Sequence, residues 1–446
     1  MSKETKIKKV RIGILPCGMV PPFSCKNFEL AYLVARGTIE EKWTKSFLKG
    51  NKIFFYDLDK GKECLTKHGV KEILKYSNID KVIKNNKIKY LWFLDKEIDY
   101  IRNWNKKNNN RIIVVNPLFR KNLENKIWFD AFLKKHSLPK PESEIYDLSK
   151  SELKLSGELV VQKPKSAGGE GTFFIKDKND FKQLIGNNKI NKNEKCLVRK
   201  KIKGKTYAIT VFVSSKKIAL SAIRQQCVSK NLTGKRRQYL GVQWIPSNNI
   251  SFNVKKEINS VFEKMGKLLY DYKFFGLTSF DFIIDNSGRV YIIECNPRLT
   301  AATAQLVKFP ELTSNLDIGG IFINEFIESS FHIDNYKIYP MPKTSFDGAV
   351  LNIDFNYNIL RKQLVIEKEY RNGIYELKNN KIIFKTPDMR RFNRKAKQFI
   401  YTSMVKAGEA YEHSETLAII TSNFRLYGAD CKINKEGKKI LEIFKH

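Results

Sequence analysis

The chain has 446 residues and a formal net charge of +36, from 82 Lys and Arg against 46 Asp and Glu. Hydrophobic residues make up 42% of it and aromatic residues 12%, enough for the cores of two or three domains, which excludes a disordered chain. No apolar run approaches the roughly 20 residues that a membrane-spanning helix needs. The short apolar run after the charged N-terminus also lacks a small-residue cleavage site. We therefore expect a cytoplasmic protein without membrane association.

The cysteines and histidines form no metal-binding or disulfide pattern. Seven cysteines are scattered without a Cys-x-x-Cys pair, and five histidines without a His-Glu-x-x-His motif. Reduced thiols are expected, and a zinc enzyme is disfavoured.

The basic charge has two explanations. Lys and Asn crowd every segment, as in 187–196 (NNKINKNEKC), which is typical of an AT-rich coding sequence and is the favoured explanation. The functional alternative is an acidic partner or substrate, and nucleic-acid binding is the less favoured function.

The first part of the chain predicts a parallel α/β sheet. Short apolar runs at 11–15, 52–57, 89–94 and 111–115 read as strands separated by helix-like segments. The turn at 16–18 lacks the Gly-x-Gly-x-x-Gly pattern of a dinucleotide site, so no NAD binding is expected.

The rest of the chain alternates differently. One amphipathic helix is expected to end before Pro139 and carries the apolar residues Leu123, Ile127, Phe129, Phe132 and Leu133. Mostly β-strands follow from about 158 to 300, with one helix at 260–272. The last hundred residues predict a strand at 348–357, a basic helix at 389–412 and short terminal strands.

A glycine-rich connection follows the strand that ends at Lys163. The segment 166–172 leads directly into a second strand, 172–175, and its glycines let backbone N–H groups approach phosphate oxygens. A Walker loop would lead into a helix instead. A tight hairpin without a ligand is the alternative, but an ammonium at a buried strand end favours a phosphate partner.

A second cluster joins acids to a guanidinium. Asp281 lies on a predicted strand, 278–284, and Glu294 on the returning strand, 289–295, after a turn at 285–288. The two carboxylates can share one face, and with Asn296 they suit Mg²⁺. Arg298 offers a planar fork for a carboxylate or phosphate. A structural ion pair between Arg298 and one acid is the alternative.

Together these motifs resemble the ATP-grasp superfamily over about 120–310. The resemblance implies that Lys126 and Lys163 contact ATP phosphates under a loop that includes Ser166, Gly168, Gly169 and Gly171. It also implies that Mg²⁺ is held by Asp281, Glu294 and Asn296. Arg298 would bind the substrate carboxylate or its acyl phosphate and act catalytically with Lys163.

One departure lies in the strand at 198–202. Many relatives carry an acidic residue there, whereas this chain has Arg199, Lys200, Lys201 and Ile202. The backbones of Lys201 and Ile202 can still bond the adenine edge, and Arg199 is assigned to the same nucleotide site. The usual acidic contact to the nucleotide is missing.

The flanking parts resemble the butirosin- and pheganomycin-type peptide ligases more than the biotin-carboxylase branch, whose long basic loop is not evident. This resemblance implies an α/β ATP-grasp fold with a Rossmann-like pre-ATP-grasp domain at 1–122, an ATP-grasp domain at 123–342 and a small α+β domain at 343–446.

The implied reaction is an ATP- and Mg²⁺-dependent ligation through an acyl phosphate. The expected partners are an amino acid or small carboxylate and an amine acceptor, with an acidic carrier protein as the alternative acceptor. Arg224, on a predicted strand, is a candidate for gripping an acidic substrate, whereas Arg236 and Arg237 read as solvated loop charges. A non-catalytic ATP-grasp relative is disfavoured because the chain retains Lys163 together with the candidate metal ligands Asp281, Glu294 and Asn296. The oligomeric state is left open, with a homodimer as one candidate.

Overall fold

The structure is a computed structural model. It describes residues 10–15, 28–36, 41, 44, 52–59, 70–93, 100, 103–104, 106–107, 111–113, 117–147, 157–166, 171–187, 189–190, 194–230, 237–298, 300, 302–318, 336–354, 363–365, 370–404, 410–412 and 416–444. Within these ranges no helix is long and apolar enough to cross a membrane.

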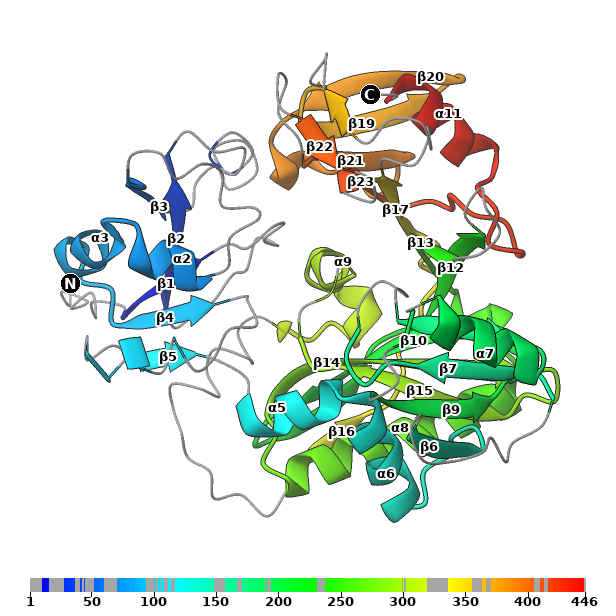
Figure 1. The fold of residues 1–446 in the computed structure, drawn as a ribbon. Helices are drawn as coiled ribbons and strands as arrows, with labels where there is room; N and C mark the ends of the chain where they lie inside the picture. The colour runs from blue at the N-terminus through cyan, green and yellow to red at the C-terminus, as the bar shows by residue number, and fades with distance from the viewer. Residues whose placement is uncertain are drawn as a thin grey trace.

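The N-terminal part contains the predicted parallel sheet (Figure 1). Its strand order is β3 (Lys52–Tyr56), β2 (Glu29–Ala35), β1 (Arg11–Leu15), β4 (Tyr90–Phe93) and β5 (Arg111–Ile113), and every neighbouring pair is parallel. Helices α2 (Val70–Lys75) and α3 (Ile79–Asn85) pack on it. Only β2 had not been predicted, because a fully buried strand shows a continuous apolar run without alternation.

The single helix predicted before Pro139 is two helices in the structure. α5 (Pro117–Glu124) ends at Asn125, and α6 (Lys126–Lys135) begins directly after it. The Asn125 side chain accepts hydrogen bonds from the N–H groups of Ile127 and Trp128, which is the capping role that starts a new helix. The prediction of one continuous helix was therefore wrong, and the break places Lys126 at a helix N-terminus.

Two sheets follow. The smaller one is antiparallel, with the order β6 (Ser143–Asp147), β9 (Lys195–Lys200), β7 (Leu159–Gln162) and β8 (Thr172–Ile175). Helix α7 (Lys178–Gly186), which had not been predicted, follows β8. The second sheet begins with β15 (Val290–Asn296), β14 (Gly276–Asp285), β10 (Gly204–Val213), β12 (Arg224–Lys230) and β13 (Arg237–Trp244). Helix α8 (Phe252–Asp271) covers it, and β11 (Lys217–Leu220) and β16 (Lys337–Tyr339) extend it beside β10.

The second sheet continues into the C-terminal part of the chain. β13 pairs with β17 (Ala349–Asp354), and the order runs on through β23 (Thr416–Ser422), β21 (Gln398–Ser403), β19 (Gly373–Lys378) and β20 (Lys381–Thr386). A separate pair joins β18 (Gln363–Val365) to β22 (Ala410–Glu412). The described residues also include the short helices α9 (Thr303–Lys308) and α11 (Lys435–Ile443). The domain boundary at residue 343 stays a prediction, as does the one at residue 123.

The helix predicted at 389–412 was wrong. Among the described residues of this segment, Met389–Arg391 form a turn of 3-10 helix, and β21 and β22 occupy much of the rest. All six residues of β21 (QFIYTS) are buried, and such β-branched and aromatic residues suit a covered strand. The terminal strands were predicted, but the helix α11 that follows them was not.

A buried guanidinium ties several of these elements together. Arg199, on β9, is 2% exposed and donates from Nε and Nη2 to Asp130 Oδ1 on α6, at 3.2 and 3.1 Å. Its Nη1 donates to Gln162 Oε1 on β7, at 3.1 Å, and to the carbonyl of Ile293 on β15, at 2.6 Å. One side chain thus bonds to two strands in different sheets and to the helix between them.

Replacing Arg199 by Met should lower the free energy of unfolding by about 1–3 kcal/mol, because Asp130 would keep Lys140 as its only cationic partner and the acceptors on Gln162 and Ile293 would lose a buried donor. The adjacent Lys200→Met is the matched control. Lys200 is exposed and its ammonium pairs with the exposed Glu142, so its replacement should cost less than about 1 kcal/mol. Denaturant unfolding of both variants measures the difference, and equal losses would contradict the role of the buried pair.

Gly241, on β13, should not tolerate a side chain. Its φ is +140°, and an added Cβ would lie 2.0 Å from the carbonyl oxygen of Val350 on β17. We expect Gly241→Ala to cost about 2–4 kcal/mol from overpacking and backbone strain. Gly186→Ala is the control, since nothing lies within 4 Å of its Cβ and Ala favours helix by about 1 kcal/mol. Melting temperatures that fall equally in both variants would refute this.

Candidate active site

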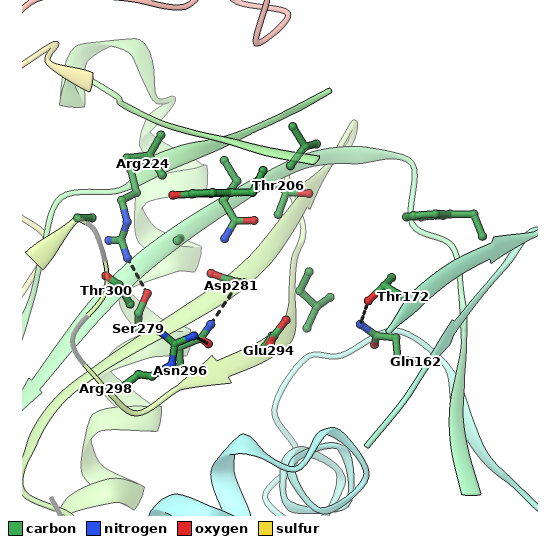
Figure 2. Close-up of a pocket in the computed structure, with 18 residues that line it drawn as sticks. Gln162, Thr172, Thr206, Arg224, Ser279, Asp281, Glu294, Asn296, Arg298 and Thr300 are labelled. Atoms are coloured by element: carbon green, nitrogen blue, oxygen red, sulfur yellow. Dashed lines mark hydrogen bonds between the residues drawn. The ribbon is translucent and has the colours of Figure 1, made fainter. Parts of the chain in front are cut away.

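The candidate site is a cavity of about 390 Å³ between the small sheet and the long sheet (Figure 2). Gln162 and Thr172 line it from the β7–β8 side, where the Gln162 amide donates to Thr172 Oγ1 at 3.3 Å. Strands β10, β12, β13, β14 and β15 supply the rest of the wall. Asp281, Glu294, Asn296 and Arg298 all line this cavity, so the structure brings the predicted acid cluster together.

The register of β14 and β15 produces this cluster. The two strands form the predicted hairpin, in which Asp281 pairs with Glu294 and Ser279 pairs with Asn296. Directly opposed residues of an antiparallel pair extend to the same side of the sheet. The Asn296 amide donates to Asp281 Oδ2 at 3.3 Å, and Arg298 Nη2 donates to Asn296 Oδ1 at 3.2 Å.

The surroundings of Asp281, on the floor of the cavity, raise the pKa of its carboxyl group to about 7. Burial is the largest cause and the negative charge of Glu294 the second, while a hydrogen bond from Gln226 and the charges of Arg224 and Arg298 lower it. A cation bound between the buried Asp281 and the partly exposed Glu294 would stabilise both negative charges.

The donors fit Mg²⁺ in number and kind. Asp281, Glu294 and Asn296 offer hard oxygen atoms, and Mg²⁺ is commonly held by one or two carboxylates together with phosphate oxygens. Among the described residues no group of three or more His, Cys, Asp or Glu could enclose a metal without such additional ligands. The assignment of these three residues to a metal stays a prediction that the chemistry of the set supports.

Lys126 connects the acid cluster to the glycine-rich connection. It begins α6 with a side chain only 3% exposed, and its Nζ donates to Glu294 Oε1 at 3.0 Å and to the carbonyl of Ser166 at 3.1 Å. Its backbone N–H donates to the carbonyl of Pro164 at 2.9 Å. The Lys126 ammonium therefore lies between the glycine-rich connection and Glu294 of the acid cluster.

The connection is closed at its base by a hydrogen bond from the Lys163 N–H to the Gly171 carbonyl, at 2.9 Å. A Cβ on Gly171 would lie 2.5 Å from Ser166 Cβ, so glycine is required there. Gly168 and Gly169 lie outside the described residues. Lys163 Nζ lies 3.9 Å from Glu194 Oε2 and lines neither this cavity nor the neighbouring one described next.

A second cavity, of about 340 Å³, adjoins the first through Glu294, Asn296 and Arg298. Ser166 lines it together with Lys121, Glu124 and Lys165, three residues that the sequence analysis missed. Lys165 belongs to the KPKSAGG run, of which the sequence analysis singled out Lys163, Ser166 and the glycines. Lys121 and Glu124 carried no signal, because their place depends on the break after α5.

The residues assigned to the adenine side lie elsewhere. The Arg199 guanidinium is enclosed by Asp130, Gln162 and Ile293. Lys201 bonds to Glu158 through both its backbone N–H and its Nζ, and Ile202 lies with it between β9 and β10. None of the three lines either cavity, and their nucleotide contacts stay predictions.

Arg224 was predicted to lie on a strand, and it is the first residue of β12. Its side chain lines the main cavity. Its Nη1 donates to Thr210 Oγ1 at 3.2 Å and its Nη2 to Ser279 Oγ at 2.6 Å. Burial lowers the pKa of Arg224. Of the two arginines expected in a loop, Arg236 lies outside the described residues, and Arg237 begins β13.

Known proteins share sequence and fold features with this chain. Residues 123–302 match the family model of an ATP-grasp domain, and a search of curated proteins returns no match. The chain is similar to the biotin carboxylase domain of Hydrogenobacter thermophilus 2-oxoglutarate carboxylase, solved with MgADP, ADP and bicarbonate, at 12% identity and TM-score 0.61 over 93% of this chain and 86% of that one.

Two further structures cover nearly the whole chain. The L-amino acid ligase of Bacillus licheniformis is similar at 13% identity and TM-score 0.56, over 93% of each chain. The N5-carboxyaminoimidazole synthetase of Staphylococcus aureus, complexed with ADP, is similar at 11% identity and TM-score 0.53, over 98% of this chain and 97% of that one. The described chain has the ATP-grasp fold, in agreement with the family-model match at residues 123–302.

Proposed function

We propose that this protein is an ATP- and Mg²⁺-dependent carboxylate–amine ligase that activates an amino acid or small carboxylic acid as an acyl phosphate. The observation that carries the proposal is the cluster of Asp281, Glu294, Asn296 and Arg298 on the floor of a cavity between two sheets. The ATP-grasp fold and the ligands named for its structural relatives, MgADP and ADP, add support.

The residues divide the work by charge. Asp281, Glu294 and Asn296 would hold Mg²⁺, which when bound would neutralise phosphate charge. Arg298, bonded to Asn296 Oδ1, presents a guanidinium to the carboxylate to be activated. Lys126 adds a buried positive charge beside Glu294, which suits a site that stabilises developing negative charge.

The nucleophile is proposed to be an amine, so that the product is an amide, as in a dipeptide. Activation is required because an ionised carboxylate is a poor electrophile, and phosphorylation supplies a good leaving group. The similarity to an L-amino acid ligase favours an amino-acid substrate. An acidic carrier protein as acceptor is the second candidate, favoured only by the net charge of +36.

Glu294→Gln should reduce ADP formation by about 10²-fold or more, because it removes one negative ligand without changing the volume of the side chain. An ADP-release assay over pooled amino acids and small acids measures this. Glu257→Gln, on the exposed face of α8, is the control and should keep wild-type turnover. Normal turnover in a folded Glu294→Gln variant would contradict the assignment of Glu294 as a metal ligand and the mechanism that depends on it.

Binding of Mg²⁺ alone should weaken as the pH falls through about 7, since Asp281 then holds a proton. Because folding raises the pKa of Asp281, the metal-free protein loses stability as the pH rises from about 4 to 7. Bound Mg²⁺ would offset this loss of stability at high pH. We expect the midpoint of Mg²⁺-induced thermal stabilisation to be about tenfold higher in concentration at pH 6 than at pH 8. In Asp281→Asn the two midpoints should agree; a wild-type midpoint independent of pH would contradict the assignment.

A further inference from the structure

Arg224 is a buried cation in the cavity wall whose charge is not matched by a bonded acid. The residue is 2% exposed, and its guanidinium donates to two hydroxyl groups, Thr210 Oγ1 and Ser279 Oγ. Its Cζ lies 5.4 Å from the centroid of the Trp244 ring. In the described part of the chain no carboxylate forms an ion pair with it. Figure 2 shows the side chain extending from β12 toward Ser279 and Thr300, on the side of the cavity where Arg298 lies.

Arg199 provides the comparison within the same protein. Both residues are 2% exposed, but Arg199 donates two hydrogen bonds to the Asp130 carboxylate, whose negative charge compensates the guanidinium. Taking a guanidinium out of water costs several kcal/mol unless an anion compensates it. The charge of Arg199 is compensated by an acid of the protein itself, whereas the charge of Arg224 can be compensated by an anionic ligand that enters the cavity.

Asp281, the acid whose charge acts on Arg224, does not supply the missing anion. The charge of Asp281 acts on Arg224, but Asp281 is shared with Glu294, Asn296 and Arg298 on the cavity floor. Under the proposed function its negative charge is directed to Mg²⁺. Arg224 then faces a cavity whose acids are already neutralised.

We propose that Arg224 binds a second carboxylate of the substrate, in addition to the carboxylate activated beside Arg298, so that the preferred substrate is a dicarboxylate such as an acidic amino acid. This inference rests on the proposed function. Gln226, Ser279 and Thr300 line the same wall and supply neutral donors to the oxygens of such a group. Two guanidinium groups in one cavity match two carboxylates on one small molecule.

The test compares acids that differ only in charge. ADP release is measured with the pairs glutamate and glutamine, and aspartate and asparagine, and with phosphoserine, in the wild type, Arg224→Met and Arg224→Lys. We expect one acidic member to exceed its amide at least tenfold in kcat/KM. Arg224→Met should lower that value about 100-fold, mainly through KM, and leave the amide nearly unchanged. Arg224→Lys should keep part of the preference, and phosphoserine should not exceed the diacids.

Two controls separate binding from folding. Arg289→Met removes an exposed cation from the β14–β15 turn and should leave rates and preferences unchanged. Arg224→Met should melt no lower than the wild type, because it removes a buried charge that lacks a bonded acid, in contrast to Arg199→Met. A large fall in the melting temperature of Arg224→Met would overturn the proposal in favour of a structural role.

Failure of the inference differs from failure of the proposed function. Equal rates with acids and amides in the wild type, an equal loss on both in Arg224→Met, or a preference for phosphoserine would overturn the inference while ADP release continued. No ADP release with any acid would reject the ligase. Thermal stabilisation by glutarate would then test the Arg224 site directly: stabilisation lost in Arg224→Met supports the site, and its absence in the wild type overturns it.

Discussion

The arrangement of the cavity depends on the buried bonds of Arg199. Its guanidinium joins Asp130 on α6, Gln162 on β7 and the carbonyl of Ile293 on β15. Gln162 lines the cavity on one side and Ile293 precedes Glu294 on the other. Lys140 and Ser143 also bond to Asp130 Oδ2, so the acid is satisfied on both oxygens. The cation on β9 thus finds its acid on the helix α6.

The sheet region of the site was predictable because its cause is local. Asp281 and Glu294 belong to one hairpin, closed by the N–H of Asp285 and the carbonyl of Arg289, and the period of two along a strand decides which residues share a face. The link from Lys126 to Glu294 spans 168 positions, and pattern could suggest it only through resemblance to a family. The helix predicted at 389–412 shows the limit of composition: basic residues around 394–397 masked the apolar strand that follows.

Satisfied and unsatisfied charges distinguish structural from functional positions in this chain. Lys126 and Arg199 are both buried and both meet carboxylates supplied by the fold. The sequence analysis assigned both to the nucleotide site through the resemblance to a family, and a resemblance does not show which partner compensates a buried charge. Partners brought from distant positions make the distinction. Arg199 is committed to the fold, Lys126 is committed to an acid that a metal would share, and Arg224 retains capacity for an anion.

The C-terminal part of the chain shapes the site through β13. Tyr239 and Val242 of this strand line the main cavity, while its other edge pairs with β17. The buried amide of Gln243 donates to the carbonyl of Gly348 and accepts from the N–H groups of Leu426 and Tyr427. A shift of the C-terminal strands would therefore move a wall of the cavity. Because buried amide groups lose much stability when left unpaired, these bonds hold β13 in one register, and the position of Tyr239 in the wall follows from contacts made almost two hundred residues later.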